Sequence, residues 1–237
     1  MAYRELSGNI FNSKAGTLVN TVNCVGVMGK GIALEFRRRY PEMFEAYKSI
    51  CEKQLLRPGQ ILPYTKQTPW ILNFAIKDDW KNPSKIEWIE SCLDKFVKNY
   101  QKMGIESIAF PWMGAMNGGI PLDQIKEITR TYLSNLPDIS IEVYDFDKTA
   151  PDPLFRRLKN IVQIPDLDVQ TLSKASTIQY HYLTKIIQAV NGEDVRSLPL
   201  LIESGLVGKT NIEKLYAFLR RPTMDIDKFH AKLQLFH

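Results

Sequence analysis

Two glycine-rich segments have the spacing of anion-binding loops. The first is residues 20–33, with glycines at 26, 29 and 31, and the second is residues 111–121, with glycines at 114, 118 and 119. Each follows a predicted strand and precedes a predicted helix, so backbone N–H groups and a helix N-terminus can converge on a negative charge. A single segment of this kind is more often a plain turn. Two of them at the carboxyl ends of parallel strands suit a ligand that carries two phosphates.

Lys77 is the second candidate for chemistry, because it directly follows the apolar run of residues 70–76. A lysine that closes a buried strand points either into a cleft or into solvent. The residue pattern alone favours solvent, so the lysine by itself does not establish a catalytic site.

Histidine and cysteine usage excludes several kinds of catalytic site. All three histidines, His181, His230 and His237, belong to the last 60 residues, so the first 150 residues act without imidazole. This excludes a Ser–His or Cys–His nucleophile there. The three cysteines are odd in number and widely spaced, which fits neither a disulfide framework nor a zinc site. We therefore expect no bound metal.

The elements that must position these residues alternate between strand and helix. Ser84 and Glu87 have the spacing of a capping box before one helix, and Pro121 opens another with Leu122 facing inward. Strands that are too apolar to face water, alternating with amphipathic helices, predict a three-layer α/β/α sandwich. The apolar runs that predict strands are residues 18–22, 70–76, 107–110 and 139–143.

The composition changes near residue 150. Residues 147–153 contain two prolines and suggest a boundary between a domain of residues 1–150 and a second part, residues 151–237. The first part holds 10 of the 13 glycines, and the second holds all of the histidines.

The second part has the pattern of a small helical module. Helical spacing of apolar residues continues from Leu172 to Val190, and Thr210 with Glu213 has the spacing of a second capping box. Residues 198–221 have the outline of a helix-turn-helix, which many helical adaptors share. We expect a packing or partner-binding role, with contact to nucleic acid as the alternative.

The overall charge and hydropathy pattern point to a soluble protein. The net charge of +5 permits a nucleic-acid partner without requiring one. No apolar run approaches the ~20 residues that a membrane span needs. The first ten residues contain no apolar core of a signal peptide, so we expect a cytoplasmic location and no membrane partner.

Four segments together resemble the macrodomain family. They read Gly-Asn-Ile at 8–10, Val-Asn-Thr-Val-Asn at 19–23, Gly-Lys-Gly-Ile-Ala at 29–33 and Gly-Ala-Met-Asn-Gly-Gly-Ile at 114–120. Macrodomains bind ADP-ribose and hold its diphosphate between two glycine loops. Residues 19–34 are similar to the branch of DarG-type DNA ADP-ribosyl glycohydrolase antitoxins, which is related to terminal ADP-ribose protein glycohydrolases. The resemblance covers about residues 3–146. It implies ADP-ribose as ligand and product, with no cofactor.

The resemblance implies a binding role for residues of each segment. Asn9 stands where many macrodomains have an aspartate that contacts the adenine amino group, so a carbonyl acceptor is kept and the charge is lost. Ile10 would supply a backbone contact to the base, and Asn20 and Asn23 would lie by the distal ribose. The phosphate loops would comprise Met28, Gly29, Lys30, Gly31 and Ile32, and then Gly114, Ala115, Met116, Asn117, Gly118, Gly119 and Ile120.

The resemblance also implies a catalytic residue. In this branch the catalytic group is a lysine at the end of the strand that follows the first helices, and its match is Lys77. Terminal glycohydrolases use an additional aspartate in the second loop, and Gly118 stands at that position, so this chain lacks the second acid. Asp78 and Asp79 follow Lys77 and either orient it or are exposed, solvated charges.

Three functions are compatible with these residues. The leading expectation is an enzyme that removes ADP-ribose from a macromolecule, above all from a DNA base, as an antitoxin would. Trp80 and Trp112 are then candidates for stacking on an unpaired base, unless they pack against their own loops. The alternatives are an ADP-ribose-binding module without turnover, and a hydrolase of a small derivative such as ADP-ribose 1″-phosphate. Expected partners are ADP-ribose, ADP-ribosylated DNA and a cognate ADP-ribosyltransferase toxin.

Overall fold

The structure is a computed structural model that describes residues 2–192 and 194–222. Contacts within the chain divide it into two compact units, one that ends at Ala150 and one that begins at Pro151. Within the described residues, every helix is too short or too polar to cross a lipid bilayer.

The first unit is built on a six-stranded sheet with the order β1-β6-β5-β2-β4-β3. Neighbouring strands run parallel, except that β3 is antiparallel to β4. In the register of the central pair, Thr17 lies opposite Trp70 and Val22 opposite Ala75. The strands are β1 (Tyr3–Gly8), β2 (Thr17–Val22), β3 (Ile61–Tyr64), β4 (Trp70–Ala75), β5 (Ser107–Pro111) and β6 (Ser140–Phe146).

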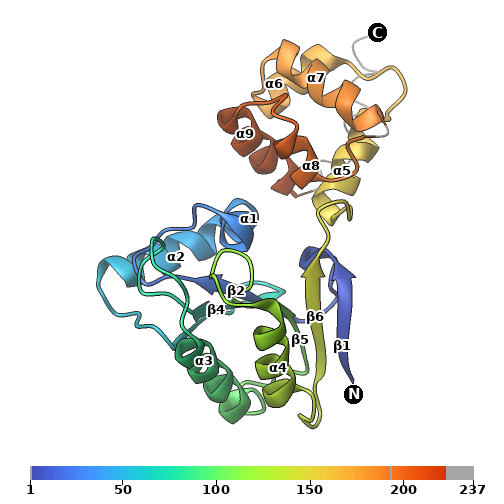
Figure 1. Cartoon of the computed structure of the whole chain (residues 1–237). Helices are drawn as coiled ribbons and strands as arrows, with labels where there is room; N and C mark the ends of the chain where they lie inside the picture. Colours follow the sequence, from blue (N-terminus) through green and yellow to red (C-terminus); the bar gives the residue numbers. More distant parts are fainter. Residues whose placement is uncertain (1, 193, 223–237) are drawn as a thin grey trace. The chain divides into compact units, whose positions relative to one another are not determined.

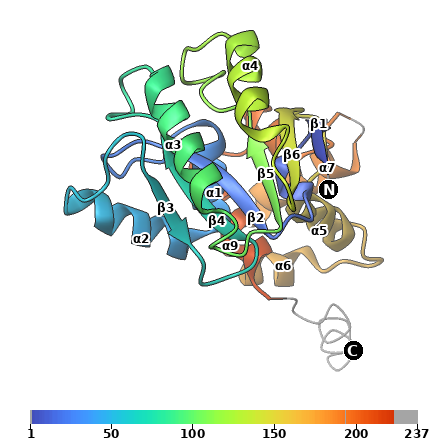
Figure 2. The same ribbon diagram turned by 90° about the horizontal axis from the view of Figure 1, so that it is seen from below.

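Helices cover both faces of this sheet (Figure 1), and Figure 2 shows the same elements from below. On one face, Phe36 of α1 (Gly31–Arg39) and Tyr47 of α2 (Pro41–Glu52) pack in one core with Ile71. On the other face, α3 (Ile86–Asn99) and α4 (Leu122–Leu133) pack in a second core with Phe74 and Phe110. A short 3-10 helix, η1 (Ile10–Asn12), follows β1. The predicted three-layer sandwich is confirmed.

The four predicted strands are present, but two further strands, β1 and β3, are not predicted by the apolar pattern. Both lie at the edges of the sheet. β1 has the sequence YRELSG, and β3 is only four residues long and contains Pro63. Edge strands carry polar residues and proline because one side of them pairs with no neighbour, so they lack the apolar run of a central strand.

Two local predictions in the first unit are wrong. α3 begins at Ile86 with Lys85 as its N-cap and without a side-chain cap, so Ser84 and Glu87 form no capping box. The N–H of Ser84 instead donates to the carbonyl oxygen of Gly118, 2.9 Å away, because the second glycine segment packs there. Leu122 is 37% exposed and does not face the core, since it occupies the first turn of α4.

The second unit is helical throughout the part that the structure describes, as predicted. It has an apolar core of its own, which includes Phe155, Leu172, Ile186, Leu201 and Leu215. The helices are α5 (Pro153–Val162), α6 (Val169–Ser176), α7 (Tyr180–Asn191), α8 (Leu198–Glu203) and α9 (Lys209–Arg220).

Two details of the second unit differ from the sequence pattern. The helical spacing between Leu172 and Val190 is interrupted, because Thr177 adopts a left-handed conformation (φ 57°) between α6 and α7. α9 begins at Lys209, one residue before Thr210, with Gly208 as N-cap and no side-chain cap. The second capping box is therefore also wrong. The role of the α8–turn–α9 pair stays a prediction.

Candidate functional site

The candidate residues gather at one edge of the sheet, where the parallel strands have their carboxyl ends. Residues 9–10 follow β1, and Lys77 follows β4. The first glycine loop (residues 23–32) follows β2, and the second glycine loop (residues 112–120) follows β5. Because β5, β2 and β4 are neighbours in the sheet, both loops and Lys77 lie side by side. Ligands of open α/β sheets bind outside this edge.

The inner half of the first glycine loop is organised by Asn23. Its Oδ1 accepts hydrogen bonds from the N–H groups of Val25 (3.0 Å) and Val27 (3.3 Å), and its Nδ2 donates to the Val27 carbonyl (2.6 Å). The hydroxyl of Tyr47 in α2 donates to Asn23 from below the loop, at 2.9 Å from the carbonyl oxygen. Asn23, expected beside a ribose, therefore holds its own loop together.

Asn20 lies inside β2 with no exposed surface. Its Nδ2 donates to Oδ1 of Asn73 in β4 at 2.9 Å, and Nδ2 of Asn73 donates to the Leu62 carbonyl at 3.1 Å. Asn20 Oδ1 is buried and has no hydrogen-bond partner among the described residues. The structure thus places Asn20 under the first loop, as part of a polar chain across three strands. A ribose contact stays a prediction.

The outer half of the first loop differs from the inner half in exposure. Met28 is buried and anchors the loop in the core, whereas Gly29, Lys30 and Gly31 are exposed. α1 begins at Gly31, and Lys30 as N-cap provides no side-chain hydrogen bond to the first turn. The first turn of a helix has unpaired N–H groups and a partial positive charge. The N–H groups at this end of α1 can therefore donate hydrogen bonds to a phosphate oxygen.

The second glycine loop folds back on itself and packs against residue 84. The N–H of Ile120 donates to the Gly114 carbonyl at 3.2 Å. A Cβ atom at Gly118 would lie 2.5 Å from Gly114 Cα and 2.7 Å from Ser84 Oγ, so the loop accepts no side chain at this position. Position 118 is where the resemblance places an acid in terminal glycohydrolases. An acid there requires a different loop backbone.

Lys77 connects the strands to the second loop. Its Nζ donates to the carbonyl oxygen of Asn117 at 2.6 Å. The side chain of Asn117 extends in the other direction, over the first loop, because a Cβ atom at Gly31 would lie only 2.5 Å from Asn117 Nδ2. Three segments that are far apart in the sequence therefore meet at Lys77, Asn117 and Gly31. The sequence predicts each residue but not their contact.

The surroundings of Lys77 make its amine easier to deprotonate than that of a fully exposed lysine. Burial lowers the pKa of Lys77 from its ordinary value, and the charge of Asp78 opposes this shift. The carboxylate of Asp78 accepts hydrogen bonds from Asn82 Nδ2 and from the N–H of Asp79, and Asp79 Oδ1 accepts from the N–H of Lys81. Both acids thus stabilise their own turn, and neither forms a hydrogen bond to Lys77 in the structure.

Cys24 is the remaining nucleophilic side chain of the first loop. Free cysteine is usually a fully buried residue type, but Cys24 is only half-buried. Burial raises its pKa to about 12, so the thiol is protonated and unreactive near neutral pH.

Asn9 and Ile10 lie at the end of β1 and are both buried. Asn9 is the N-cap of η1, where its Oδ1 accepts a hydrogen bond from the N–H of Phe11 at 3.1 Å. The carbonyl acceptor expected to contact adenine therefore already has a backbone donor. The adenine contact stays a prediction.

The Macro domain family model matches residues 19–129. The solved macrodomain of Thermus aquaticus DarG is 37% identical with a TM-score of 0.58, and the match covers 60% of this chain and 97% of that chain. This chain belongs to the macrodomain family.

Two curated proteins are similar to the same part of this chain. The DNA ADP-ribosyl glycohydrolase of Thermus aquaticus is 38% identical over 146 residues, which are 60% of this chain and 41% of that protein. The DNA ADP-ribosyl transferase-DNA ADP-ribosyl glycohydrolase fusion protein of Thermosipho africanus is 32% identical over 62% of this chain and 43% of its own length. DarTG of that organism has been solved in complex with ADP-ribose, and it matches with a TM-score of 0.56. This chain thus spans about two fifths of the length of the curated relatives it matches.

The two tryptophans proposed for stacking differ in exposure. Trp112 is 8% exposed and packs in the core on the α3–α4 face of the sheet. Its ring therefore packs within its own unit. Trp80 is 52% exposed. Two other large apolar side chains are also exposed, Met116 of the second loop (74%) and Val25 of the first loop (47%). The N–H of Cys24 donates to the Asp78 carbonyl, which brings Val25 and Trp80 to the same edge of the macrodomain.

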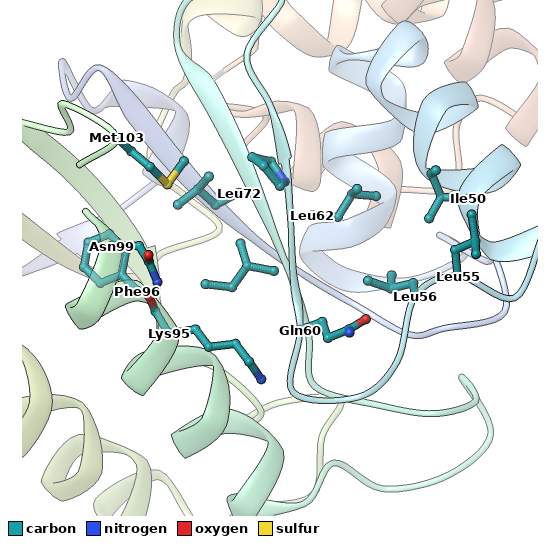
Figure 3. A pocket seen from close by; sticks show the side chains of 12 residues that line it. Ile50, Leu55, Leu56, Gln60, Leu62, Leu72, Lys95, Phe96, Asn99 and Met103 are labelled. Atoms are coloured by element: carbon teal, nitrogen blue, oxygen red, sulfur yellow. Dashed lines mark hydrogen bonds between the residues drawn. The ribbon is translucent and has the colours of Figure 1, made fainter. Parts of the chain in front are cut away.

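A groove of about 430 Å³ lies elsewhere in the macrodomain (Figure 3). It is lined mainly by apolar side chains of the β3 edge and of the helices beside it, including Leu62, Ile50 and Phe96. Its charged residue, Lys95, already donates to the Gly59 carbonyl and to Ser91. The groove contains none of the predicted site residues.

Sequence reasoning overlooked two residues that shape the site. Tyr47 supports the first loop, and Ser84 supports the second through its backbone N–H. A tyrosine on the inward face of α2 was a usable signal, because a buried hydroxyl needs a hydrogen-bond partner. The backbone contact of Ser84 has no counterpart in the residue pattern.

Proposed function

We propose that this macrodomain hydrolyses the bond between ADP-ribose and a DNA base, with Lys77 as the catalytic group. The observation that carries the proposal is the position of Lys77 Nζ, 2.6 Å from the carbonyl of Asn117, a residue of the second loop whose side chain lies beside Gly31 of the first loop. A catalytic amine must lie next to the bound phosphates, since the distal ribose is attached to them. The names of the relatives in Thermus and Thermosipho support the reaction and the DNA acceptor.

The binding part of the proposal rests on the two loops. The exposed Gly29–Gly31 backbone and the N-terminus of α1 bind one phosphate, and the second glycine loop binds the other. Asn9 and Ile10, at the end of β1, lie on the adenine side. No cofactor takes part in the reaction, and ADP-ribose is the product.

Hydrolysis breaks the bond between the anomeric carbon of the distal ribose and the base. The electron pair of that bond leaves with the base, which takes up a proton. The ribose carbon acquires partial positive charge as the bond breaks. The neutral amine of Lys77 forms a bond to this carbon and loses a proton. Water then adds to the same carbon and releases the amine, so that the net reaction consumes one water molecule.

The acceptor side of the site is apolar, and this favours a base over a charged protein side chain. Trp80 follows Lys77 by three residues in the chain, and Met116 and Val25 belong to the two glycine loops; all three are large apolar residues that remain exposed. Exposed aromatic rings bind unpaired bases by stacking, which is tolerant of base type. We propose that Trp80 stacks on the ADP-ribosylated base, and that a DNA ADP-ribosyltransferase toxin produces this substrate.

The experiment compares ADP-ribosylated single-stranded DNA with ADP-ribosylated protein as substrates of the full chain. We expect release of ADP-ribose from DNA, and a loss of about 1000-fold or more in kcat for Lys77→Ala. Calorimetry should find the ADP-ribose affinity of this variant nearly unchanged, because the phosphate contacts come from other segments. Lys98→Ala is the matched control, since Lys98 is exposed on α3 and pairs with Asp94. Full activity of Lys77→Ala would refute Lys77 as the catalytic group, whereas no release of ADP-ribose by the wild-type chain would leave an ADP-ribose-binding module as the function.

The pH dependence tests the chemical role of the lysine. Burial lowers the pKa of Lys77, so an amine nucleophile becomes available below the ordinary lysine pKa. The rate should therefore rise with pH through the pKa of Lys77, and Lys77→Arg should be inactive. A rate that falls through this range, with activity retained in Lys77→Arg, would assign an electrostatic role to the charged lysine.

A further inference from the structure

Asn117 contacts both the lysine and the first glycine loop. Its backbone carbonyl accepts the hydrogen bond from Lys77 Nζ at 2.6 Å. Its side chain lies on the opposite loop, where Nδ2 is 2.5 Å from the place that a Cβ atom of residue 31 would occupy. One exposed residue thus joins the two loops and the lysine.

The carbonyl of Asn117 is held in place by its neighbours in the second loop. The next residue, Gly118, packs closely against Gly114 and Ser84, because a Cβ atom built on it would lie 2.5 Å from Gly114 Cα and 2.7 Å from Ser84 Oγ. Its carbonyl accepts a hydrogen bond from the N–H of Ser84 at 2.9 Å, which ties the loop to the start of α3. Lys77 is therefore bound to a fixed acceptor, although its own side chain is long and flexible.

The contact with the first loop depends on glycine at position 31. Gly31 has a φ of 57°, in the left-handed region, and it is the first residue of α1. A side chain there would collide with the Asn117 amide. The absence of a Cβ atom consequently does more than open the backbone to a phosphate, because it also makes room for Asn117.

We propose that Asn117 is a positioning residue for Lys77. Its carbonyl oxygen fixes Nζ at the edge of the site, and its side chain ties that carbonyl to the first glycine loop. The inference rests on the proposed function, in which Lys77 acts on the ribose attached to the bound diphosphate. In this proposal the contact between the two loops aligns the amine of Lys77, and the strand that carries the lysine does not.

The proposal predicts an effect on catalysis more than on binding. Removing the Asn117 side chain leaves the carbonyl present but loosens its tie to the first loop, so Nζ becomes more mobile and more hydrated. A misaligned amine lowers kcat, whereas the phosphate contacts that determine KM remain. Greater hydration also raises the pKa of Lys77 toward its ordinary value, because partial burial is the main cause that lowers it.

The experiment measures kcat, KM and the pH profile of Asn117→Ala on ADP-ribosylated single-stranded DNA, with the full chain. We expect kcat to fall about tenfold with KM within about twofold, and the inflection of the pH profile to move to higher pH. Asn99→Ala is the matched control, since Asn99 is exposed and donates to Lys95 within α3. Unchanged kcat, or a rise of KM alone, would overturn the assignment.

A second variant tests the same contact from the other loop. Gly31→Ala pushes the Asn117 amide away and should lower kcat in the wild-type background by more than it does in Asn117→Ala. Equal effects in both backgrounds would contradict a contact between the two residues.

A readout without turnover separates this inference from the proposed function. NMR of isotope-labelled lysine in the full chain reports the Lys77 pKa directly, and it should rise in Asn117→Ala but not in Asn99→Ala. If the Lys77 pKa rises in Asn117→Ala but the wild-type chain releases no ADP-ribose, the proposed function is refuted and the contact is supported. If the Lys77 pKa is unchanged in Asn117→Ala and the wild-type chain releases ADP-ribose, the contact is refuted and the proposed function stands.

Discussion

The two glycine loops lie side by side at the edge of the sheet, but Gly29 of the first loop and Gly118 of the second are glycine for different reasons. In the first loop, Gly29 is exposed, and a Cβ atom there would meet only Val27 Cγ1 at an ordinary 3.7 Å. In the second loop, a Cβ atom at Gly118 would lie 2.5 Å from the Cα atom of Gly114 and would also collide with the Gly114 carbonyl oxygen. The fold of the first loop tolerates a side chain at 29, whereas the fold of the second loop excludes one at 118.

This difference separates binding from folding in the same kind of sequence. A glycine that the fold does not need is the better sign of a ligand, because close approach of a ligand is what remains to explain it. A glycine that the loop itself needs says little about a ligand. Substitutions at Gly29 therefore test phosphate binding, while substitutions at Gly118 test the structure of the loop.

The largest expected effect is that of Gly118→Ala on stability. The methyl group collides with backbone atoms, so we expect the first unit to lose about 3 kcal/mol of unfolding free energy. All four tryptophans belong to residues 70–112, so their fluorescence during denaturant unfolding reports on this unit. Gly29→Ala is the control and should change the unfolding free energy by less than about 0.5 kcal/mol. Equal effects of the two substitutions would remove the distinction between the loops.

The next effect concerns affinity alone. Gly29→Glu places a carboxylate where the first loop is proposed to bind the diphosphate, and like charges at close range cost several kcal/mol. We expect the affinity for ADP-ribose, measured by calorimetry, to fall at least about 100-fold, while the unfolding free energy stays within about 0.5 kcal/mol of wild type. Unchanged affinity would show that this loop does not bind the diphosphate.

The smallest effect tests the support beneath the first loop. Tyr47→Phe removes the hydroxyl that donates to Asn23, and a buried hydrogen bond of this kind contributes about 1 kcal/mol. The affinity for ADP-ribose should fall too, but less than in Gly29→Glu. In the control Tyr100→Phe, a tyrosine hydroxyl that donates to the Pro137 carbonyl is lost. This control should lower stability by a similar amount and leave the affinity unchanged. An equal loss of affinity in both variants would assign it to general destabilisation.

The sequence by itself determined the elements and the kind of residues at their ends. The apolar runs predict the central strands β2, β4, β5 and β6, because a strand covered on both faces has no polar alternation. The glycines and Lys77 follow directly after those strands, which is a property of the chain order alone. The resemblance of residues 8–34 and 114–120 to macrodomains added the ligand.

The tertiary structure decided which of these residues meet. The order β5-β2-β4 in the sheet brings Asn117 and Gly31 to Lys77, although they are 40 and 46 positions away in the chain. It also buries Trp112, turns Ser84 from a helix cap into a support for Gly118, and leaves Trp80 exposed. Local patterns report the preferences of neighbouring residues. A contact between distant segments depends on strand order and register, and only the packed sheet determines those.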